Sequence, residues 1–232
     1  MLKLERVSSA YGASQVLWDV NMSVAPGEAV TLLGRNGVGK TTLLKTIVGL
    51  QPLKTGKLLF EDKPLTSTPA FGRARKGVAY VPQGRGIFPH LTVAENLTMG
   101  LAAVDAPGKA TIPDLVFELF PVLHEMLARK GGNLSGGQQQ QLAIGRALAA
   151  KPKLLLLDEP TEGIQPSIVV QIGEALARVR SELGVAILLV EQYLEFAWGF
   201  ADSYLVMQRG RVIAEGRTAE TDQLEVARLL SV

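Results

Sequence analysis

The sequence predicts a single α/β domain over residues 1–232, built on a parallel sheet that a helical segment interrupts. Strand-like and helix-like segments alternate near both ends of the chain, whereas the middle reads as successive helices. The length of 232 residues suits one domain, because domains commonly reach about 250 residues. We therefore expect a core of about residues 1–83 and 151–232, with a helical subdomain of about residues 84–150.

The first part of the chain predicts an antiparallel β start, then a glycine-rich loop and a helix. Pro26-Gly27 reads as the turn before the third strand, and the helix after the loop is apolar through Val48. We expect strands at residues 2–7, 19–24, 28–33, 57–60 and 78–81, the last ended by a break at residues 82–84.

Helices dominate the middle, and strands return near the end. Thr92 and Glu95 are spaced as a capping box, in which hydroxyl and carboxylate each satisfy an orphan amide, so a helix starts there towards Gly100. Ser135 should cap another helix that reaches about Ala150. We also expect helices at residues 113–120, 122–128 and 166–183, strands at 154–157 and 185–190, and a hairpin around 208–211.

Composition excludes several classes of protein. Although 47% of the residues are hydrophobic, there is no run of about 18 apolar residues, the length that spans a bilayer. The first residues lack a cationic stretch followed by an apolar block, so we expect a cytoplasmic location. With 0 Cys, disulfides and thiolate metal sites are excluded, and only His90 and His124 remain as imidazoles.

Charge argues against a nucleic-acid partner. The formal net charge of +2 reflects a near balance of acidic and basic residues and not a basic stripe. We expect the cluster of Arg73, Arg75 and Lys76 to form a solvated face, and His90 to be a surface residue.

A glycine-rich loop between an apolar strand and a helix predicts a phosphate site. Two glycines separated by four residues precede Lys40 and Thr41, which is the P-loop pattern. Backbone amides would surround phosphate oxygens, while the lysine reaches the terminal phosphates and the threonine hydroxyl binds Mg²⁺. The alternative is a structural glycine-rich turn. The expected ATP-binding residues are Gly34, Arg35, Asn36, Gly37, Val38, Gly39, Lys40, Thr41 and Thr42.

Two carboxylates end a buried strand later in the chain. Apolar residues 154–157 lead into Asp158 and Glu159, and a strand adjacent to the one before the P-loop would deliver both to the phosphates. We expect Asp158 to hold Mg²⁺ and Glu159 to polarise the water that attacks the γ-phosphate. A helix cap before Pro160 is the alternative reading.

The most specific pattern is Leu-Ser-Gly-Gly-Gln at residues 134–138. Ser135 at a helix N-terminus with two following glycines makes a second phosphate-binding surface. An ordinary cap explains the serine but not the glycines, each of which weakens a helix by about 1 kcal/mol. The segment resembles the signature motif of ABC ATPases, and the whole chain is similar to that P-loop NTPase family, motif after motif in the same order.

The resemblance implies a RecA-like core, an antiparallel β subdomain, a helical insert and a dimer. In the family the signature motif faces the P-loop of a partner subunit, so a monomer should be nearly inactive. The signature residues expected to contact that nucleotide are Ser135, Gly136, Gly137 and Gln138.

Two further residues match family motifs. Gln83 resembles the Q-loop glutamine, which touches Mg²⁺ and relays the nucleotide state to the helical insert, although a plain turn glutamine is the alternative. Tyr11 stands where the family places an aromatic ring that stacks on adenine, and core packing is its alternative.

The sequence departs from the general family pattern at two positions. Gln192 replaces the switch histidine, and Gln165 stands where the D-loop often carries aspartate. The amide of Gln192 can donate a hydrogen bond to the γ-phosphate but cannot titrate near neutral pH, so hydrolysis should depend on Glu159. The usual cross-dimer contact of the D-loop aspartate is in doubt here.

These departures are similar to those in one branch of the family, the ATPase subunits of branched-chain amino acid and amide importers. The resemblance lies in residues 81–89, 117–121, 137–142, 160–167 and 189–192. Within it, residues 35–38 and 160–167 look most like a urea importer ATPase. This implies a second ATPase subunit, identical or different, two permease subunits, an extracytoplasmic solute-binding protein, and a peripheral place on the cytoplasmic face of the inner membrane.

Three other functions remain open from the sequence. A branched-chain amino acid importer would use the same chemistry, because the transported solute never touches the ATPase. A soluble ABC ATPase on nucleic acid or the ribosome usually carries two cassettes or a long coiled-coil insert, and a small-molecule kinase would leave residues 134–138 unexplained.

Overall fold

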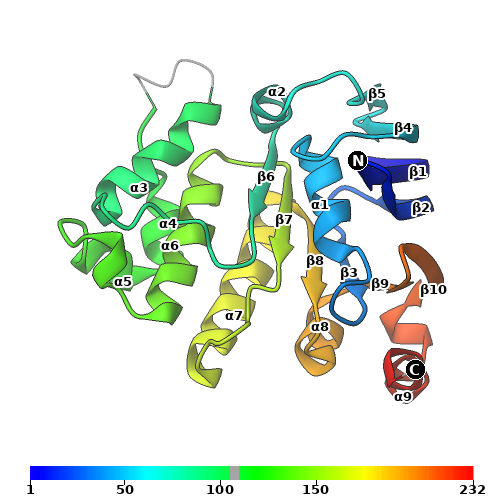
Figure 1. The fold of residues 1–232 in the computed structure, drawn as a ribbon. Helices are drawn as coiled ribbons and strands as arrows, with labels where there is room; N and C mark the ends of the chain where they lie inside the picture. Colours follow the sequence, from blue (N-terminus) through cyan, green and yellow to red (C-terminus); the bar gives the residue numbers. More distant parts are fainter. Residues whose placement is uncertain (105–109, 232) are drawn as a thin grey trace.

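The computed structural model describes residues 1–104 and 110–231, and its main sheet runs in the order β10-β9-β3-β8-β7-β6 (Figure 1). The pairs from β9 to β6 are parallel, and β10 is antiparallel to β9. The expected α/β fold with a final hairpin is confirmed. The strands are β3 (Ala29–Leu33), β6 (Val78–Val81), β7 (Leu154–Asp158), β8 (Ala186–Glu191), β9 (Ser203–Gln208) and β10 (Arg211–Arg217).

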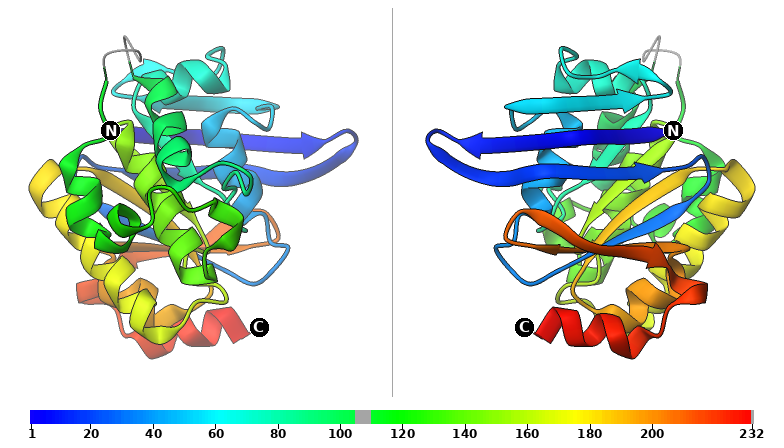
Figure 2. Two further views of the ribbon diagram at one scale, coloured as in Figure 1. Left: turned by 90° about the vertical axis from the view of Figure 1, so that its left-hand side faces the viewer. Right: turned by 90° about the vertical axis from the view of Figure 1, so that its right-hand side faces the viewer.

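A second, antiparallel sheet has the order β2-β1-β4-β5. The first two strands are longer than expected because the polar residues near their turn also pair, down to Tyr11 with Ser14. Figure 2 shows this hairpin, in blue, reaching beyond the neighbouring elements. The strands are β1 (Leu2–Tyr11), β2 (Ser14–Val24), β4 (Thr55–Phe60) and β5 (Lys63–Pro64).

Helix α1 (Lys40–Val48) packs between the two sheets. Its Leu43 and Ile47 share a hydrophobic core with Leu4 of β1 and Leu156 of β7. Strands β3, β7 and β8 are buried along their whole length, since alternate side chains enter this core and a second one on the opposite face. The continuous apolar runs that predicted buried strands are thus explained by burial on both faces.

The second core is covered by helices, and several of them gather at the left of Figure 1. These are α3 (Val93–Gly100), α4 (Asp114–Leu119), α5 (Pro121–Glu125) and α6 (Gly136–Ala149), all within the expected helical region. The cap expected at Ser135 and the capping box expected at Thr92 are confirmed, and Ser135 also forms a capping box. The short 3₁₀ turns are Leu101–Ala103, Gly131–Asn133 and Thr218–Glu220.

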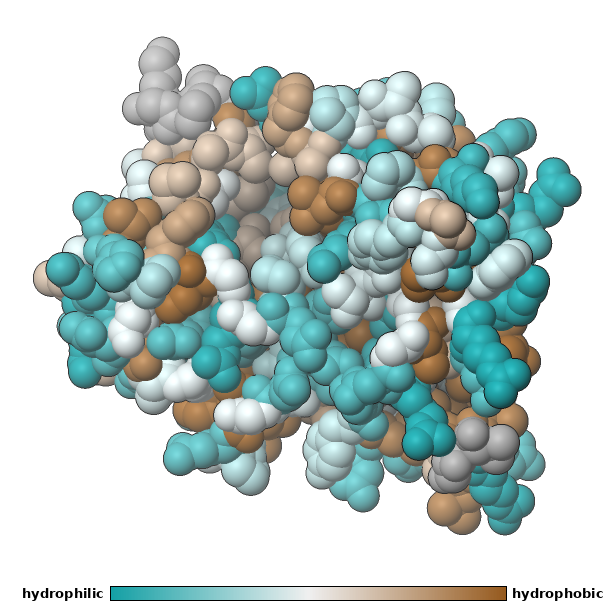
Figure 3. All heavy atoms as spheres, viewed as in Figure 1, coloured by the Kyte–Doolittle hydropathy of each residue, from teal (hydrophilic) through white to brown (hydrophobic). Residues whose placement is uncertain are grey.

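Helix α7 (Pro166–Leu183) has the predicted bounds, whereas three other helices were not expected. They are α2 (Ala70–Arg75), α8 (Leu194–Phe200) and α9 (Gln223–Ser231). In the parts of the chain that the structure describes, no helix combines the length and apolar character needed to cross a bilayer. The face seen in Figure 3 mixes hydrophilic and hydrophobic side chains.

The expectation of one solvated basic face is wrong for Arg73. Arg75 and Lys76 are exposed, but Arg73 is only 6% exposed. Its guanidinium donates to the carbonyl oxygens of Thr46 and Ile47, each at 2.8 Å. The last carbonyls of a helix lack intrahelical partners and carry the negative end of its dipole, so a cation is favourable there. Arg73 therefore closes the C-terminal end of α1.

We expect Arg73→Met to lower the free energy of unfolding by about 2–4 kcal/mol, because the buried carbonyls lose a charged donor. The matched variant Arg75→Met, at an exposed site in the same helix, should stay within about 0.5 kcal/mol of the parent. Urea unfolding followed by circular dichroism measures both. Equal effects at the two positions would contradict the helix-closing role of Arg73.

Candidate functional site

The P-loop joins the end of β3 to the start of α1. Gly39 has a φ of 113°, in the left-handed region that favours glycine, and the helix after it has no side-chain cap and no acidic residue in its first turn. A Cβ on Gly34 would lie 2.6 Å from the carbonyl oxygen of Met207. The first amides of α1 are thus left for a ligand, and an anion suits them.

Lys40 points back into this loop and is nearly buried. Its Nζ donates to the carbonyl oxygens of Gly34 at 2.6 Å and Arg35 at 3.0 Å. The same Nζ lies 3.5 Å from Oε1 of Glu159, and both side chains are almost fully buried. The loop therefore holds an ammonium group beside a carboxylate, away from bulk water.

The two carboxylates reach the P-loop by a route that differs from the expected one. Strand β7, which ends at Asp158, is not adjacent to β3, because β8 lies between them. The carboxyl ends of all three parallel strands still lie at one edge of the sheet. Helix α1 begins at the same edge, directly after the P-loop. As a result, Thr41 Oγ1 donates to Asp158 Oδ1 at 3.2 Å.

Asp158 has a second partner that the sequence analysis missed. The hydroxyl of Tyr80 donates to Asp158 Oδ2 at 3.1 Å from the neighbouring strand β6. Burial raises the pKa of Asp158, against the hydrogen bonds from Thr41 and Tyr80. Burial, and then the Asp158 charge, raises the pKa of Tyr80, so its hydroxyl stays a donor. No sequence motif marked Tyr80 for this contact, which follows from the pairing of β6 with β7.

Glu159 lies at the centre of a network of side-chain amides. Its φ is 50°, uncommon outside glycine, and its side chain is buried. Gln83 Nε2 donates to Glu159 Oε2 at 3.1 Å, and Gln192 Nε2 donates to Oε1 at 2.7 Å. Gln192 Nε2 also donates to Oδ1 of Asn36 in the P-loop, at 2.7 Å. The structure thus brings together five of the expected side chains, those of Asn36, Lys40, Gln83, Glu159 and Gln192. Among the described residues, Lys40 is the only cation within 4.0 Å of the Glu159 carboxylate.

The proposed metal ligands are only partly assembled. Thr41 and Asp158 are in contact, whereas Gln83 donates to Glu159 and Glu162. Among the described residues there is no cluster of three or more His, Asp or Glu side chains that could hold a metal alone. One carboxylate and one hydroxyl still fit Mg²⁺, which usually keeps several waters and takes its other ligands from substrate phosphates.

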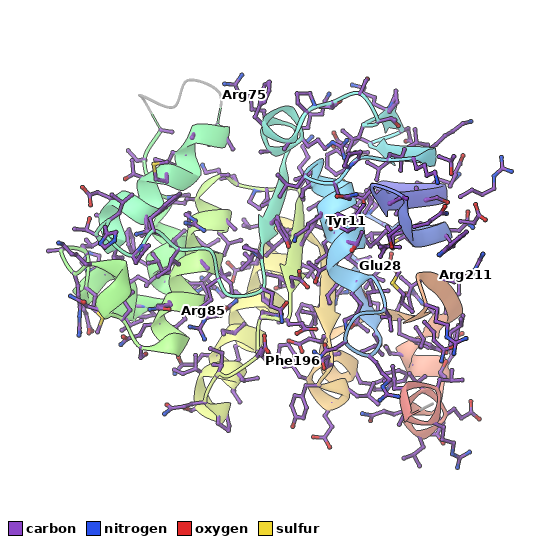
Figure 4. All side chains as sticks on the ribbon, viewed as in Figure 1. Tyr11, Glu28, Arg75, Arg85, Phe196 and Arg211 are labelled. Atoms are coloured by element: carbon purple, nitrogen blue, oxygen red, sulfur yellow. The ribbon has the colours of Figure 1, made fainter. Side chains whose placement is uncertain are left out.

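The signature residues lie apart from this network. Ser135 Oγ accepts from the Gln138 amide at 3.3 Å, and Gln138 Oε1 accepts from the Ser135 amide at 2.9 Å. A Cβ on Gly136 would meet the Arg85 guanidinium, which is labelled in Figure 4. Within the described ranges no hydrogen bond or ion pair joins residues 135–138 to the P-loop. The signature residues and the P-loop therefore form separate parts of the surface of one chain.

Tyr11 is not a core residue, because 49% of it is exposed near the tip of the β1–β2 hairpin (Figure 4). The same hairpin reaches the P-loop through β2. A Cβ on Gly39 would lie 3.1 Å from Leu17 and 3.5 Å from Val16. The exposed ring of Tyr11 is free to stack on a ligand.

This geometry defines the class of the protein. A glycine-rich loop at a helix N-terminus, a buried lysine and two carboxylates at the same sheet edge form a nucleotide site of the P-loop α/β type. The family model for "ABC transporter" matches residues 17–162. The chain belongs to the ABC transporter family, as an ATPase that couples ATP hydrolysis to transport.

Curated relatives cover nearly the whole chain. The chain is 46% identical to the high-affinity branched-chain amino acid transport ATP-binding protein BraG of Pseudomonas aeruginosa, over 92% of this chain and 91% of that one. It is 35% identical to a probable branched-chain amino acid transport ATP-binding protein LivF of Archaeoglobus fulgidus, over 95% and 93%.

Solved structures agree on the fold. An ATP-binding subunit of an ABC transporter superposes with a TM-score of 0.86 at 28% identity, covering 100% of both chains. A dimeric ATP-binding cassette in a post-hydrolysis state, bound to ADP and Pi, gives a TM-score of 0.83 at 25% identity, covering 94% of this chain and 99% of that one. The expected ABC ATPase fold and enzyme class are confirmed.

We expect Lys40→Ala and Glu159→Gln to separate binding from hydrolysis in the assembled transporter. Lys40→Ala should weaken ATP binding by about tenfold or more, because a buried charged donor is lost. Glu159→Gln should keep ATP binding and slow hydrolysis by about 100-fold or more. Fluorescent nucleotide titration and phosphate release measure the two effects. Hydrolysis by Glu159→Gln at the parent rate would rule out Glu159 as the group that activates water.

We expect substitutions of Gln192 to rank by charge. Gln192→Ala removes the donor to Glu159, whereas Gln192→Glu places a second carboxylate where the amide stood, 2.7 Å from Glu159 Oε1. Because a carboxylate at the exposed position 192 would repel the buried Glu159 carboxylate, kcat should fall further in Gln192→Glu than in Gln192→Ala. Steady-state hydrolysis at saturating MgATP measures both. A Gln192→Glu enzyme that matches the parent would show that this contact is dispensable.

Proposed function

We propose that this chain is the ATP-hydrolysing subunit of a branched-chain amino acid importer. The observation that carries the choice of solute is the 46% identity to BraG over 92% of the chain. The sequence by itself favoured a urea importer ATPase over this alternative, but that preference rests on residues 35–38 and 160–167 alone. The two curated relatives reported above favour the amino acid reading.

In this proposal each residue has a role that its contacts support. Lys40 and the first amides of α1 bind the β- and γ-phosphates, with residues 34–42 forming the wall of the loop. Glu159 accepts a proton from the attacking water, and Gln192, whose amide lies beside Glu159 and Asn36, donates to the γ-phosphate. Tyr11 stacks its exposed ring on the adenine.

In this proposal Thr41 and Asp158 would hold Mg²⁺, and Gln83 would be a further ligand once it no longer donates to Glu159. When bound, the ion neutralises charge on the β- and γ-phosphates. The side chain of Gln83 belongs to the segment after β6 that leads into the helical region. Through this exchange between Glu159 and the metal site, Gln83 would relay the nucleotide state to the helical subdomain, residues 84–150.

A second ATPase subunit completes each site. The separation of residues 135–138 from the P-loop within one chain supports an arrangement in which each ATP lies between the P-loop of one subunit and the signature motif of the other. The solved ATP-binding cassette with ADP and Pi is itself a dimer. Two permease subunits and an extracytoplasmic binding protein then handle the solute, with the ATPases on the cytoplasmic face of the membrane.

Uptake of labelled leucine and labelled urea tests the proposal in cells whose own copy is replaced. We expect leucine uptake to collapse in cells carrying Lys40→Ala, because ATP binding is lost, and urea uptake to stay at the parent level. The control Lys57→Ala removes an exposed lysine on β4 and should support normal uptake of both solutes.

The other outcomes are equally informative. Loss of urea uptake alone would establish the urea alternative and reject the amino acid reading. Parent-level uptake of both solutes in the Lys40→Ala cells would reject both importer readings, while ATP hydrolysis by the assembled complex would still report on the nucleotide site.

A further inference from the structure

Glu191 is a buried carboxylate to which none of the proposed roles applies. It is the last residue of β8 and only 2% exposed. It pairs in register with Leu33, so it stands at the sheet edge where the P-loop begins. No lysine, arginine or histidine of the described residues forms an ion pair with it. Its charge is therefore satisfied by hydrogen bonds alone.

These hydrogen bonds come from two different loops. Glu191 Oε1 accepts from the amide and the hydroxyl of Thr161, at 3.0 Å and 2.7 Å. The other oxygen, Oε2, accepts from the amide of Gln192 at 3.1 Å. One carboxylate thus connects the loop that follows β7 to the loop that follows β8.

Both loops position Glu159, which belongs to the first of them and is contacted by the second. Gln192, whose backbone Glu191 fixes, sends its side chain to Glu159 Oε1 at 2.7 Å. Thr161 lies two residues after Glu159, whose left-handed φ of 50° persists only when its surroundings hold it. The Glu159 amide also donates to the carbonyl oxygen of Val190, next to Glu191, at 2.8 Å.

The connection between the two loops depends on a carboxylate at position 191, although burying that charge is costly. Burial raises the pKa of Glu191, against the hydrogen bonds from Thr161 and Gln192, so the ionised form carries a desolvation cost. A neutral amide of the same size has one acceptor oxygen and would serve one loop only. The carboxylate is the side chain of this length that accepts from both loops at once.

We propose that Glu191 is a positioning residue for ATP hydrolysis, which orients Glu159 and Gln192 by joining the loops after β7 and β8. The inference rests on the proposed roles of Glu159 and Gln192. It assigns to Glu191 no contact with ATP, so its loss should affect turnover and not binding.

The test uses the assembled transporter in lipid vesicles and compares Glu191→Gln with Thr161→Val and Thr161→Ser. Glu191→Gln should lower kcat by about tenfold or more with KM for ATP within about twofold of the parent. Thr161→Val, which loses the hydroxyl, should lower kcat in the same way, while Thr161→Ser keeps the hydroxyl and should restore it. The double variant Glu191→Gln with Thr161→Val should be no slower than Glu191→Gln alone, because the two substitutions break the same connection between the loops.

Parent-like kcat in Glu191→Gln would overturn the inference, as would a loss that appears entirely in KM. If Glu191→Gln does not assemble, a parent-like kcat in Thr161→Val overturns it, and a fall in Thr161→Val that Thr161→Ser rescues supports it. Glu159→Gln is measured in parallel. Its hydrolysis at the parent rate would reject the site assignment itself, whereas a slow Glu159→Gln beside a parent-like Glu191→Gln would reject only the role of Glu191.

Discussion

The parallel register of β3, β8 and β7 is the constraint on which the rest of the site depends. Because the three strands run in one direction, their carboxyl ends meet at one edge, and the loops that follow them begin within reach of one another. Lys40, Gln192 and Glu159 each come from the loop or helix after one of these strands. A register slip by one residue would send each strand's last side chain to the opposite face of the sheet.

Burial of these strands on both faces stabilises this register against a slip of one strand along the next. The cores above and below the sheet take alternate side chains from the same strands, so neither face can shift towards solvent. Helix α1 contributes to one of these cores, and its C-terminal carbonyls are closed by the buried Arg73. The lysine at the start of α1 is therefore fixed in part by packing and hydrogen bonds about two turns away from the phosphate site.

The sequence predicted the elements that have a local cause and missed those that depend on tertiary context. Ser135 and Thr92 were predicted correctly because a capping box is local, and the P-loop was predicted because its glycines and lysine are contiguous. The expected adjacency of β7 to β3 was wrong, since adjacency in a parallel sheet is set by how the strands are connected and leaves no mark within a strand. Arg73 was misplaced because its neighbours Arg75 and Lys76 are exposed and only the end of α1 distinguishes it.

Electrostatics explains why glutamine suits position 192. Three carboxylates, those of Asp158, Glu159 and Glu191, are buried at this edge. In the described part of the chain only Lys40 forms an ion pair with one of them, Glu159. An amide at position 192 donates to Glu159 without changing this charge at any pH, whereas an imidazole would add a charge that depends on pH. Because the buried charge remains negative, a nucleotide polyphosphate needs its own cation to enter, which is a physical reason to expect MgATP, and not free ATP, as the substrate.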